Sequence, residues 1–158
     1  MSKKLLIVII VLLLIGVAGY AYGYFIVRNA IFKSVQTMQV TDFKLLSFSL
    51  LPPQATVELT FTIRNPTSVN LEIHDIYLEI YIDNFYVGDI TAKNKILLAH
   101  GKTTLKGTYK LTPQLVIHLG TSKKINLHIQ GYIDASGKFL FLKIPYHYEV
   151  NVQQVVEG

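Results

Sequence analysis

The chain has 158 residues, 51% of them hydrophobic, with 15 Lys and Arg against 10 Asp and Glu, and it contains no cysteine. The missing thiols exclude disulfide bonds and thiolate metal sites, so a folded domain must be stabilised by its core alone. The lysines are scattered, and Lys123-Lys124 is the only adjacent pair after residue 27. A nucleic-acid-binding protein carries a dense basic stripe, so we expect no nucleic-acid partner.

Residues Leu5 to Val27 form 23 consecutive residues without a charge. As a helix rising about 1.5 Å per residue they reach roughly 34 Å, enough to cross a hydrocarbon core of about 30 Å. We favour an uncleaved membrane anchor over residues 1–27, because the apolar run exceeds the h-region of a signal peptide. The alternative is a cleavable secretory signal with a small-residue cleavage site at 17–19 or 19–21.

Under both interpretations we expect the remainder of the chain to be exported across the membrane. Lys3 and Lys4 precede the run, whereas Arg28 and Lys33 follow it. The positive-inside rule gives a small margin for a cytoplasmic N-terminus. We therefore expect a single-pass protein of the cell membrane with its C-terminal domain outside the cytoplasm.

Gly16, Gly19 and Gly23 fall within about 60° of one another on a helix surface. Gly19 and Gly23 also form a GxxxG pair, which permits close helix approach and predicts self-association within the membrane. The alternative is that glycine is simply common in transmembrane helices. Beyond the run, the spacing of Ile31 and Val35 predicts a connector over 28–39 in which the helix continues.

From residue 40 the hydrophobic period changes from helical to two, which predicts strands. In one of them Val57, Leu59, Phe61 and Ile63 alternate with residues expected to be exposed, Thr56, Glu58, Thr60 and Thr62. Further strands are expected over 43–50, 76–82, 85–90, 95–98, 103–111, 125–130 and 139–152, with turns at Asp83-Asn84 and 134–137.

Thr112-Pro113 predicts the start of one short helix that ends at Gly120. A parallel α/β sheet would need a helix between most of its strands. The pattern therefore predicts an all-β fold, an antiparallel β-sandwich of about seven strands over 40–152, with a tail over 153–158.

The order of motifs from Ala55 to Leu111 resembles the late embryogenesis abundant group 2 family and its water-stress and hypersensitive-response (WHy) domain. The resemblance covers roughly residues 40–152. The features that carry it are Asn65-Pro66 at a strand end, Ser68 to Ile73, Ile76-x-Leu78, Phe85 to Gly88, Gly101-x-Thr103, Gly131 and Ile144-Pro145.

The resemblance implies an immunoglobulin-like or fibronectin-like sandwich and a non-enzymatic role in stress protection, membrane-associated defence or scaffolding. Some membrane-anchored relatives have proposed roles in lipid handling. It brings no catalytic residues and no cofactor. Structural explanations account for the positions that match the family motif, which are Asn65, Pro66, Gly88, Gly131 and Pro145. Asn65 suits a turn, Pro66 stops the strand, and Pro145 marks a bulge or an edge strand.

The sequence contains no Gly-x-Ser-x-Gly elbow, phosphate-binding glycine loop or His-Glu-x-x-His motif, so we expect no enzyme. His147 and Glu149 share a strand face, with His128 on a neighbouring strand, and metal ions use such ligands. Exposed histidines on strands are usually only polar surface, so we expect no metal site.

Four tyrosines, Tyr77, Tyr81, Tyr146 and Tyr148, are candidates for a surface that contacts a partner or lipid. Tyrosine also favours half-buried strand positions, so both interpretations stay open. The leading hypothesis is a membrane-anchored, non-enzymatic module for protection against heat or desiccation or for envelope protein interaction. The alternatives are a lipid-binding module beside the membrane and a subunit of an extracellular assembly.

Overall fold

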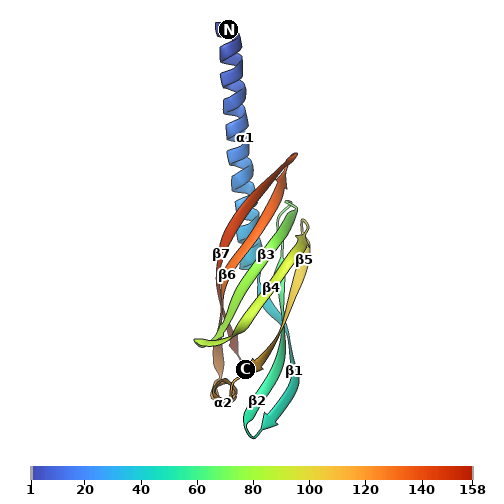
Figure 1. Cartoon of the computed structure of the whole chain (residues 1–158), viewed down its shortest axis with the longest axis vertical. Coiled ribbons are helices and arrows are strands. Elements are labelled where there is room, and N and C mark those ends of the chain that lie inside the picture. Colours follow the sequence, from blue (N-terminus) through green and yellow to red (C-terminus); the bar gives the residue numbers. More distant parts are fainter. Residues whose placement is uncertain (1, 158) are drawn as a thin grey trace.

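The computed structural model describes residues 2–157 and consists of a long helix joined to a β-sandwich (Figure 1). In chain order the elements are α1 (Lys3–Gln36), β1 (Gln39–Leu50), β2 (Pro53–Arg64), β3 (Leu71–Ile82), β4 (Phe85–Leu97), β5 (Lys102–Leu111), α2 (Pro113–Thr121), β6 (Lys124–Phe139) and β7 (Leu142–Glu157). Residues 153–157, expected to form a tail, continue β7, and Gly158 lies outside the described residues.

The strands form two sheets, ordered β1-β2-β5 and β4-β3-β6-β7, and every neighbouring pair is antiparallel. The chain crosses between the sheets after β2, after β4 and through α2. The predicted antiparallel sandwich of seven strands, with one short helix and a long apolar helix before it, is confirmed for the described residues.

The core lies between the inner faces of the two sheets. On β3 the alternation places Ile76, Leu78, Ile80 and Ile82 inward, as the sequence predicts. Each fully buried side chain of this size contributes roughly 1.5–3 kcal/mol through the hydrophobic effect. Burial of this kind must stabilise the sandwich without help from disulfides.

Two threonines of β2 are buried, although the sequence predicts them to be exposed. Thr60 and Thr62 are only 8% and 5% exposed, and Thr41 Oγ1 of β1 lies 2.8 Å from Thr62 Oγ1. The prediction is wrong because β2 is the central strand of its sheet, so side chains of β1 and β5 cover its outer face.

β4 is one continuous strand, whereas the sequence predicts two short strands over 85–90 and 95–98, the first of them interrupted at Gly88. Residues 91–93, between the two predicted strands, pair with β3. Its register with β3 shifts next to Gly88, where Ile80 pairs with Gly88 but Tyr81 pairs with Tyr86. A bulge of this kind accommodates an extra residue without ending the strand. The glycine therefore does not terminate β4.

The turn predicted at 134–137 is also wrong. These residues pair with β7, from Asp134 opposite His147 to Gly137 opposite Ile144, and the chain reverses at Leu140 and Phe141 instead. Ala135 and Gly137, two small residues that resemble a turn in the sequence, are buried on the side of β6 that faces α1. A Cβ added to Gly137 would lie 2.8 Å from the side chain of Val27, so this position has room only for glycine at the observed spacing.

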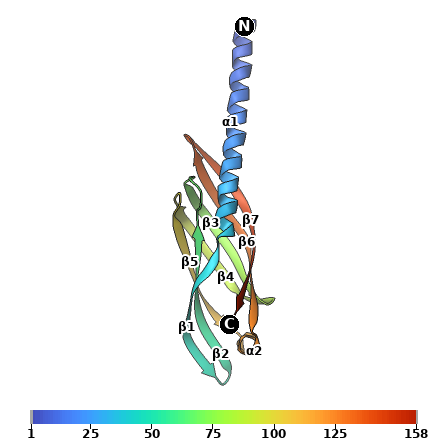
Figure 2. The same cartoon turned by 180° about the vertical axis from the view of Figure 1, so that it is seen from behind.

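The second part of α1 belongs to the core. Val27, Ala30, Ile31 and Val35 are at most 2% exposed, and the helix packs mainly against β6 and β7 (Figure 2). After the helix, Thr37 accepts a hydrogen bond of 2.8 Å from the backbone amide of Arg64 at the end of β2. Residues 28–39, expected to be a connector, thus supply helix and core side chains.

The first part of α1 projects away from the sandwich, and its apolar side chains are exposed on all sides. Among residues 2–157, α1 is the one helix long and apolar enough to cross a membrane, a property that signal sequences share. Both cleavage sites considered above precede Gly23, where burial of the helix begins. Loss of such a leader would therefore leave the docked part of the helix in place.

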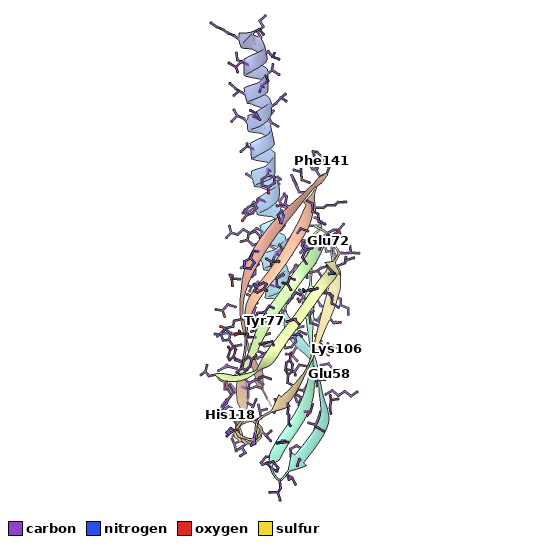
Figure 3. All side chains as sticks on the ribbon, in the orientation of Figure 1. Glu58, Glu72, Tyr77, Lys106, His118 and Phe141 are labelled. Atoms are coloured by element: carbon purple, nitrogen blue, oxygen red, sulfur yellow. The ribbon has the colours of Figure 1, made fainter. Side chains whose placement is uncertain are left out.

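α2 begins as predicted. Thr112 is its N-cap and accepts a hydrogen bond of 3.3 Å from the Leu115 amide, and Pro113 occupies the first turn. Leu115 is buried and Leu119 is half-buried. His118, labelled in Figure 3, lies 2.7 Å from Asp83 of the β3–β4 turn and ties the helix to that turn.

Candidate functional site

The inner face of β1 carries a row of apolar side chains that the sandwich leaves uncovered. Phe43 and Leu45 lie opposite inward-facing residues of β2, and so do Phe48 and Leu50. Directly opposed residues in antiparallel strands point to the same face. A bulge at Leu46 shifts the register by one residue and keeps all four on the inner side.

These side chains face the core side of the sheet, yet they are 54–72% exposed, and Leu51 at the turn is 92% exposed. The reason is visible in Figure 1, where the β1–β2 hairpin extends past α2 and past the end of the facing sheet. Contiguous exposed apolar surface of this kind typically marks a site that binds another molecule.

The same row continues into a cleft of about 500 Å³ between the sheets. Phe43 belongs to both, and together we call them the distal trough. The cleft is lined by apolar residues from both sheets and from α2, with a polar rim at Ser122, Lys123 and Gln154; the apolar residues are Val40, Phe43, Leu59, Ile82, Leu119, Ile125 and Leu127.

The trough exists because the sandwich is closed on one side and open on the other. On the closed side β4 and β5 contact each other, with the Tyr109 ring of β5 over Gly88 of β4. On the open side the edges β1 and β7 do not pair. Helix α1 fills the part of this gap nearest the N-terminus, and among the described residues none fills the distal part.

The three glycines of α1 differ in their surroundings. Side chains added to Gly16 and Gly19 would meet nothing within 4 Å. A Cβ on Gly23 would lie 2.5 Å from Phe139 and 2.7 Å from Ile144, because the β6–β7 hairpin packs there. One member of the GxxxG pair is therefore covered by the chain's own domain, and the predicted self-association surface is open at Gly16 and Gly19.

The Asn65-Pro66 motif forms a buried corner between the sheets. Asn65 is 1% exposed, and its Nδ2 donates to the carbonyls of Val69 and Leu97 at 2.6 and 3.2 Å. Its Oδ1 accepts from the amide and the hydroxyl of Thr67 at 3.0 and 2.6 Å. The side chain thus joins the β2–β3 crossover to the end of β4, in a structural role.

Gly131 marks a close approach of two backbones. A Cβ there would lie 2.0 Å from the Tyr77 carbonyl oxygen of β3, in a conformation (φ 155°) that L side chains rarely adopt. Gly88 (φ 159°) is required because the Tyr109 ring covers it. Pro145 lies on β7, which is an edge strand, as one of the two interpretations of this residue expects.

The four candidate tyrosines do not form one surface. Tyr77 and Tyr81 lie on the outer face of the β4-β3-β6-β7 sheet, where both hydroxyls donate to Glu79 at 3.1 and 2.7 Å. Tyr77 is labelled in Figure 3. Tyr146 and Tyr148 lie on the inner side, where they contact Tyr24 and Phe32 of α1 with ring centroids 5.4 and 6.2 Å apart.

Hydrogen bonding on the outer face keeps its tyrosines protonated. The bond to Glu79 raises the pKa of Tyr77 to about 12, and the bond to Asp89 raises the pKa of Tyr86 to about 12. Tyr77 also stacks on Tyr132 with centroids 5.9 Å apart. This face is a set of hydrogen-bonded phenols whose partners are carboxylates.

The histidines considered as metal ligands have protein partners. His147 contacts Asp134 through Nδ1 and Glu149 through Nε2, the latter at 2.8 Å. The hydrogen bond to Asp134 and then that to Glu149 raise the pKa of His147 above its ordinary value. His128 Nε2 lies 2.6 Å from Asn151 Oδ1. No group of three or more His, Asp or Glu residues suited to a metal ion occurs within residues 2–157.

Sequence reasoning missed two features. One is the distal trough, whose residues form an ordinary apolar alternation in the sequence. The other is the tip of the β6–β7 hairpin, where four apolar residues, Phe139 to Leu142, lie between Lys138 and Lys143. A lysine-flanked apolar run next to a chain reversal was the signal that could have revealed the tip.

No family model and no curated protein matches the chain. Similar solved structures include a "Putative ApaA Protein" from Bordetella pertussis, with a TM-score of 0.47 and 12% identity over 76% of this chain and 92% of that chain. A protein from Arabidopsis thaliana has a TM-score of 0.40 and 17% identity over 74% of this chain and 80% of that one.

The similar structures also include a "putative late embryogenesis abundant (LEA) protein", with a TM-score of 0.35 and 15% identity over 74% of this chain and 70% of that chain.

Proposed function

We propose that the chain is a non-enzymatic binding module, tethered to a membrane by the first part of α1, that captures extended apolar segments of other proteins in its distal trough. The observation that carries the proposal is the row of exposed, inward-facing apolar side chains on β1. Capture of this kind would protect partly unfolded envelope proteins during heat or desiccation, the role that the family resemblance implies.

β1 has the two properties that recognition of an extended segment requires. It is an edge strand, so the backbone groups on its free edge can pair with an added strand. Its inner side chains are apolar, whereas its outer face carries Asp42, Lys44, Ser47 and Ser49, which keep that face soluble. Main-chain pairing supplies affinity without selecting one sequence, as a general protective module needs.

The tether is supported by the exposed first part of α1. Its side chains are apolar around the whole helix circumference, with large residues from Leu5 to Val17 at least 37% exposed. A helix that is apolar all round is stable when buried in a protein core or in a bilayer. No part of the described chain covers these residues, and a bilayer would.

The proposal can be tested with the full chain in lipid nanodiscs. Heat-induced aggregation of a thermolabile model enzyme, followed by light scattering, is compared for the parent chain, Phe48→Ser/Leu50→Ser, and the control Ile96→Ser/Leu98→Ser. The control residues are similarly apolar and exposed, but Ile96 lies near the end of β4 and Leu98 directly after it, outside the trough. Circular dichroism confirms that each variant is folded.

We expect the parent chain and the control to suppress aggregation and the trough variant to lose this effect. The proposal fails if the parent chain does not suppress aggregation at equimolar or higher amounts. It also fails if the trough variant protects as well as the control does.

A second candidate function is binding of a lipid acyl chain, which the enclosed part of the trough favours. Its volume of about 500 Å³ lies within the roughly 300–1,000 Å³ of typical small-molecule sites, and Lys123 at the rim offers a positive charge to an anionic head group. Leu119→Trp would fill this cleft, whereas Ile117→Trp places the same ring on the exposed side of α2.

Mass spectrometry of the purified full chain gives the test. We expect stoichiometric lipid with the parent chain and with Ile117→Trp, and little with Leu119→Trp. Equal amounts of lipid in the two variants, or none in the parent chain, would contradict lipid binding in the cleft.

A further inference from the structure

The β6–β7 hairpin ends in an apolar tip that no other part of the described chain covers. Leu140 is 78% exposed and Phe141 is 86% exposed. Figure 3 shows Phe141 at the extreme end of the hairpin, on the side of the sandwich from which α1 projects. Lys138 and Lys143 flank the tip and are opposite each other in the register. Lys143 Nζ also lies 2.6 Å from Glu72 of β3.

The tip lies beside the apolar run of α1. The Phe139 ring contacts Tyr22 edge-on with centroids 5.6 Å apart, and the same ring lies over Gly23. The end of the β6–β7 hairpin extends farther toward the N-terminal end of the helix (Figure 1), and Phe141 lies at that end (Figure 3). Along the axis of α1, the tip therefore lies at the same height as Tyr22, which belongs to the uncharged run.

The rise of α1 per residue gives the depth of the tip in the bilayer. Tyr22 lies 17 residue steps beyond Leu5, which is about 26 Å at 1.5 Å per residue. The hydrocarbon core of a bilayer is about 30 Å thick. With Leu5 at one boundary of that core, Tyr22 lies at or just inside the other, and so does the tip that packs beside it.

We propose that the β6–β7 tip inserts into the surface of the bilayer that α1 spans and forms a second membrane contact. Leu140 and Phe141 enter the acyl region, while Lys138 and Lys143 stay at the level of the lipid phosphates, whose negative charge attracts basic side chains. The inference rests on the membrane attachment in the proposed function and is independent of what the distal trough binds.

The second contact would fix the orientation of the sandwich. A single helix leaves a domain free to rotate about the membrane normal and to tilt. Gly23 of α1 and Gly137 of β6 permit close packing of helix and hairpin, so tip and helix form one rigid base. The sandwich then projects end-on from the bilayer, and the distal trough faces away from it.

The chain contains no tryptophan, so one introduced tryptophan reports its own surroundings. Three variants of the full chain are reconstituted into vesicles with and without brominated lipid, which quenches nearby tryptophan. Phe141→Trp reports the tip, Leu12→Trp reports the middle of the apolar run, and Leu51→Trp reports the opposite end of the sandwich. All three side chains are at least 63% exposed, so the substitutions leave the core intact. Circular dichroism checks the fold.

We expect brominated lipid to quench Leu12→Trp and Phe141→Trp strongly and to leave Leu51→Trp unchanged. Quenching of Leu12→Trp without quenching of Phe141→Trp would overturn the inference and leave the anchor in place. An unquenched Leu12→Trp would overturn both.

Two further outcomes also count against the proposal. Blue-shifted but unquenched emission from Phe141→Trp would mean that protein, such as a second copy of the chain, covers the tip. Equal quenching of Phe141→Trp and Leu51→Trp would mean that the sandwich lies flat on the membrane.

Discussion

At the scale of single residues, Asn65 has the most demanding position. Its side chain amide is buried and uses both its nitrogen and its oxygen, with two carbonyls as acceptors and Thr67 as donor. An aspartate has nearly the same shape but offers no nitrogen donor. The carbonyls of Val69 and Leu97 would then face a carboxylate oxygen.

We therefore expect Asn65→Asp to lower the free energy of unfolding by about 3 kcal/mol, the scale of buried polar groups left unsatisfied. Asn94→Asp is the matched control, because Asn94 is exposed and at a positive φ (56°) that aspartate tolerates. Thermal unfolding of the full chain in nanodiscs measures both. Equal melting temperatures for the two variants would contradict the structural role of the corner.

His147 gives a prediction with a defined pH dependence. Its folded-state pKa is raised by Asp134 and Glu149, and the pKa of an unfolded histidine is about 6.5. A raised folded-state pKa means that the stabilising contribution is complete below the unfolded value and disappears as the pH rises through the folded value.

His147→Gln should therefore lower the melting temperature most at about pH 5.5, below the unfolded pKa, and the loss should become smaller toward about pH 9, as the pH rises through the raised folded value. His100→Asn is the control, since His100 is exposed and at a positive φ (56°) that asparagine tolerates. A loss of stability for His147→Gln that is the same at both pH values would show that the carboxylate contacts do not raise the pKa.

At the scale of elements, the docking of α1 depends on two glycines that face side chains of the partner element. Gly23 lies under Phe139 and Ile144, and Gly137 lies under Val27. Gly23→Leu and Gly137→Leu should each wedge the helix away from the hairpin and lower the free energy of unfolding by about 1–3 kcal/mol, the usual scale of overpacking. Gly19→Leu should leave the melting temperature unchanged, because its surroundings are open.

The open glycines carry the separate prediction of self-association. Gly16→Leu/Gly19→Leu should reduce chemical crosslinking between chains in native membranes without changing the melting temperature of the domain. If crosslinking persists at the parent level, the two glycines do not mediate self-association and reflect only the high frequency of glycine in membrane helices. Gly23 is unsuitable for this test because its substitution also disturbs docking.

Elements were predictable from the sequence where local pattern and tertiary environment agree. The alternation of β3, the Thr112-Pro113 start of α2 and the Asp83-Asn84 turn required no tertiary information. Residues 134–137 were predicted incorrectly, because the glycine at 137 is explained by the packing of Val27 rather than by a turn. A contact between residues more than 100 positions apart leaves no local periodicity.

At the scale of the whole molecule, the proposed arrangement places the two ends of the structure on opposite sides of the bilayer. The chain has no cysteine, so single introduced cysteines can be labelled selectively. In intact cells, a membrane-impermeant maleimide should label Leu51→Cys, and it should label Lys3→Cys only after permeabilisation. Labelling of Lys3→Cys in intact cells would reverse the orientation, and N-terminal sequencing of the purified protein would detect a cleaved leader.

The distal trough is also a property of the whole molecule. Phe43, Leu45, Phe48 and Leu50 have the composition of a buried strand face, and sequence alone assigns such residues to the core. Their exposure depends on the length of the β1–β2 hairpin relative to the facing sheet, and their common face depends on the bulge at Leu46. Neither the relative length of the hairpin nor the position of the bulge can be read from the alternation of one strand.

The sequence by itself determined the fold class, the long apolar helix, the Asn-Pro corner and the absence of disulfides. These follow from local period, turn chemistry and composition, which act over a few residues. The tertiary structure alone decided that α1 enters the core, that Gly23 faces the hairpin, that an apolar tip lies beside the helix and that β1 borders an open trough. These depend on how surfaces distant in the chain meet, and the fit between two surfaces is not a property of either segment alone.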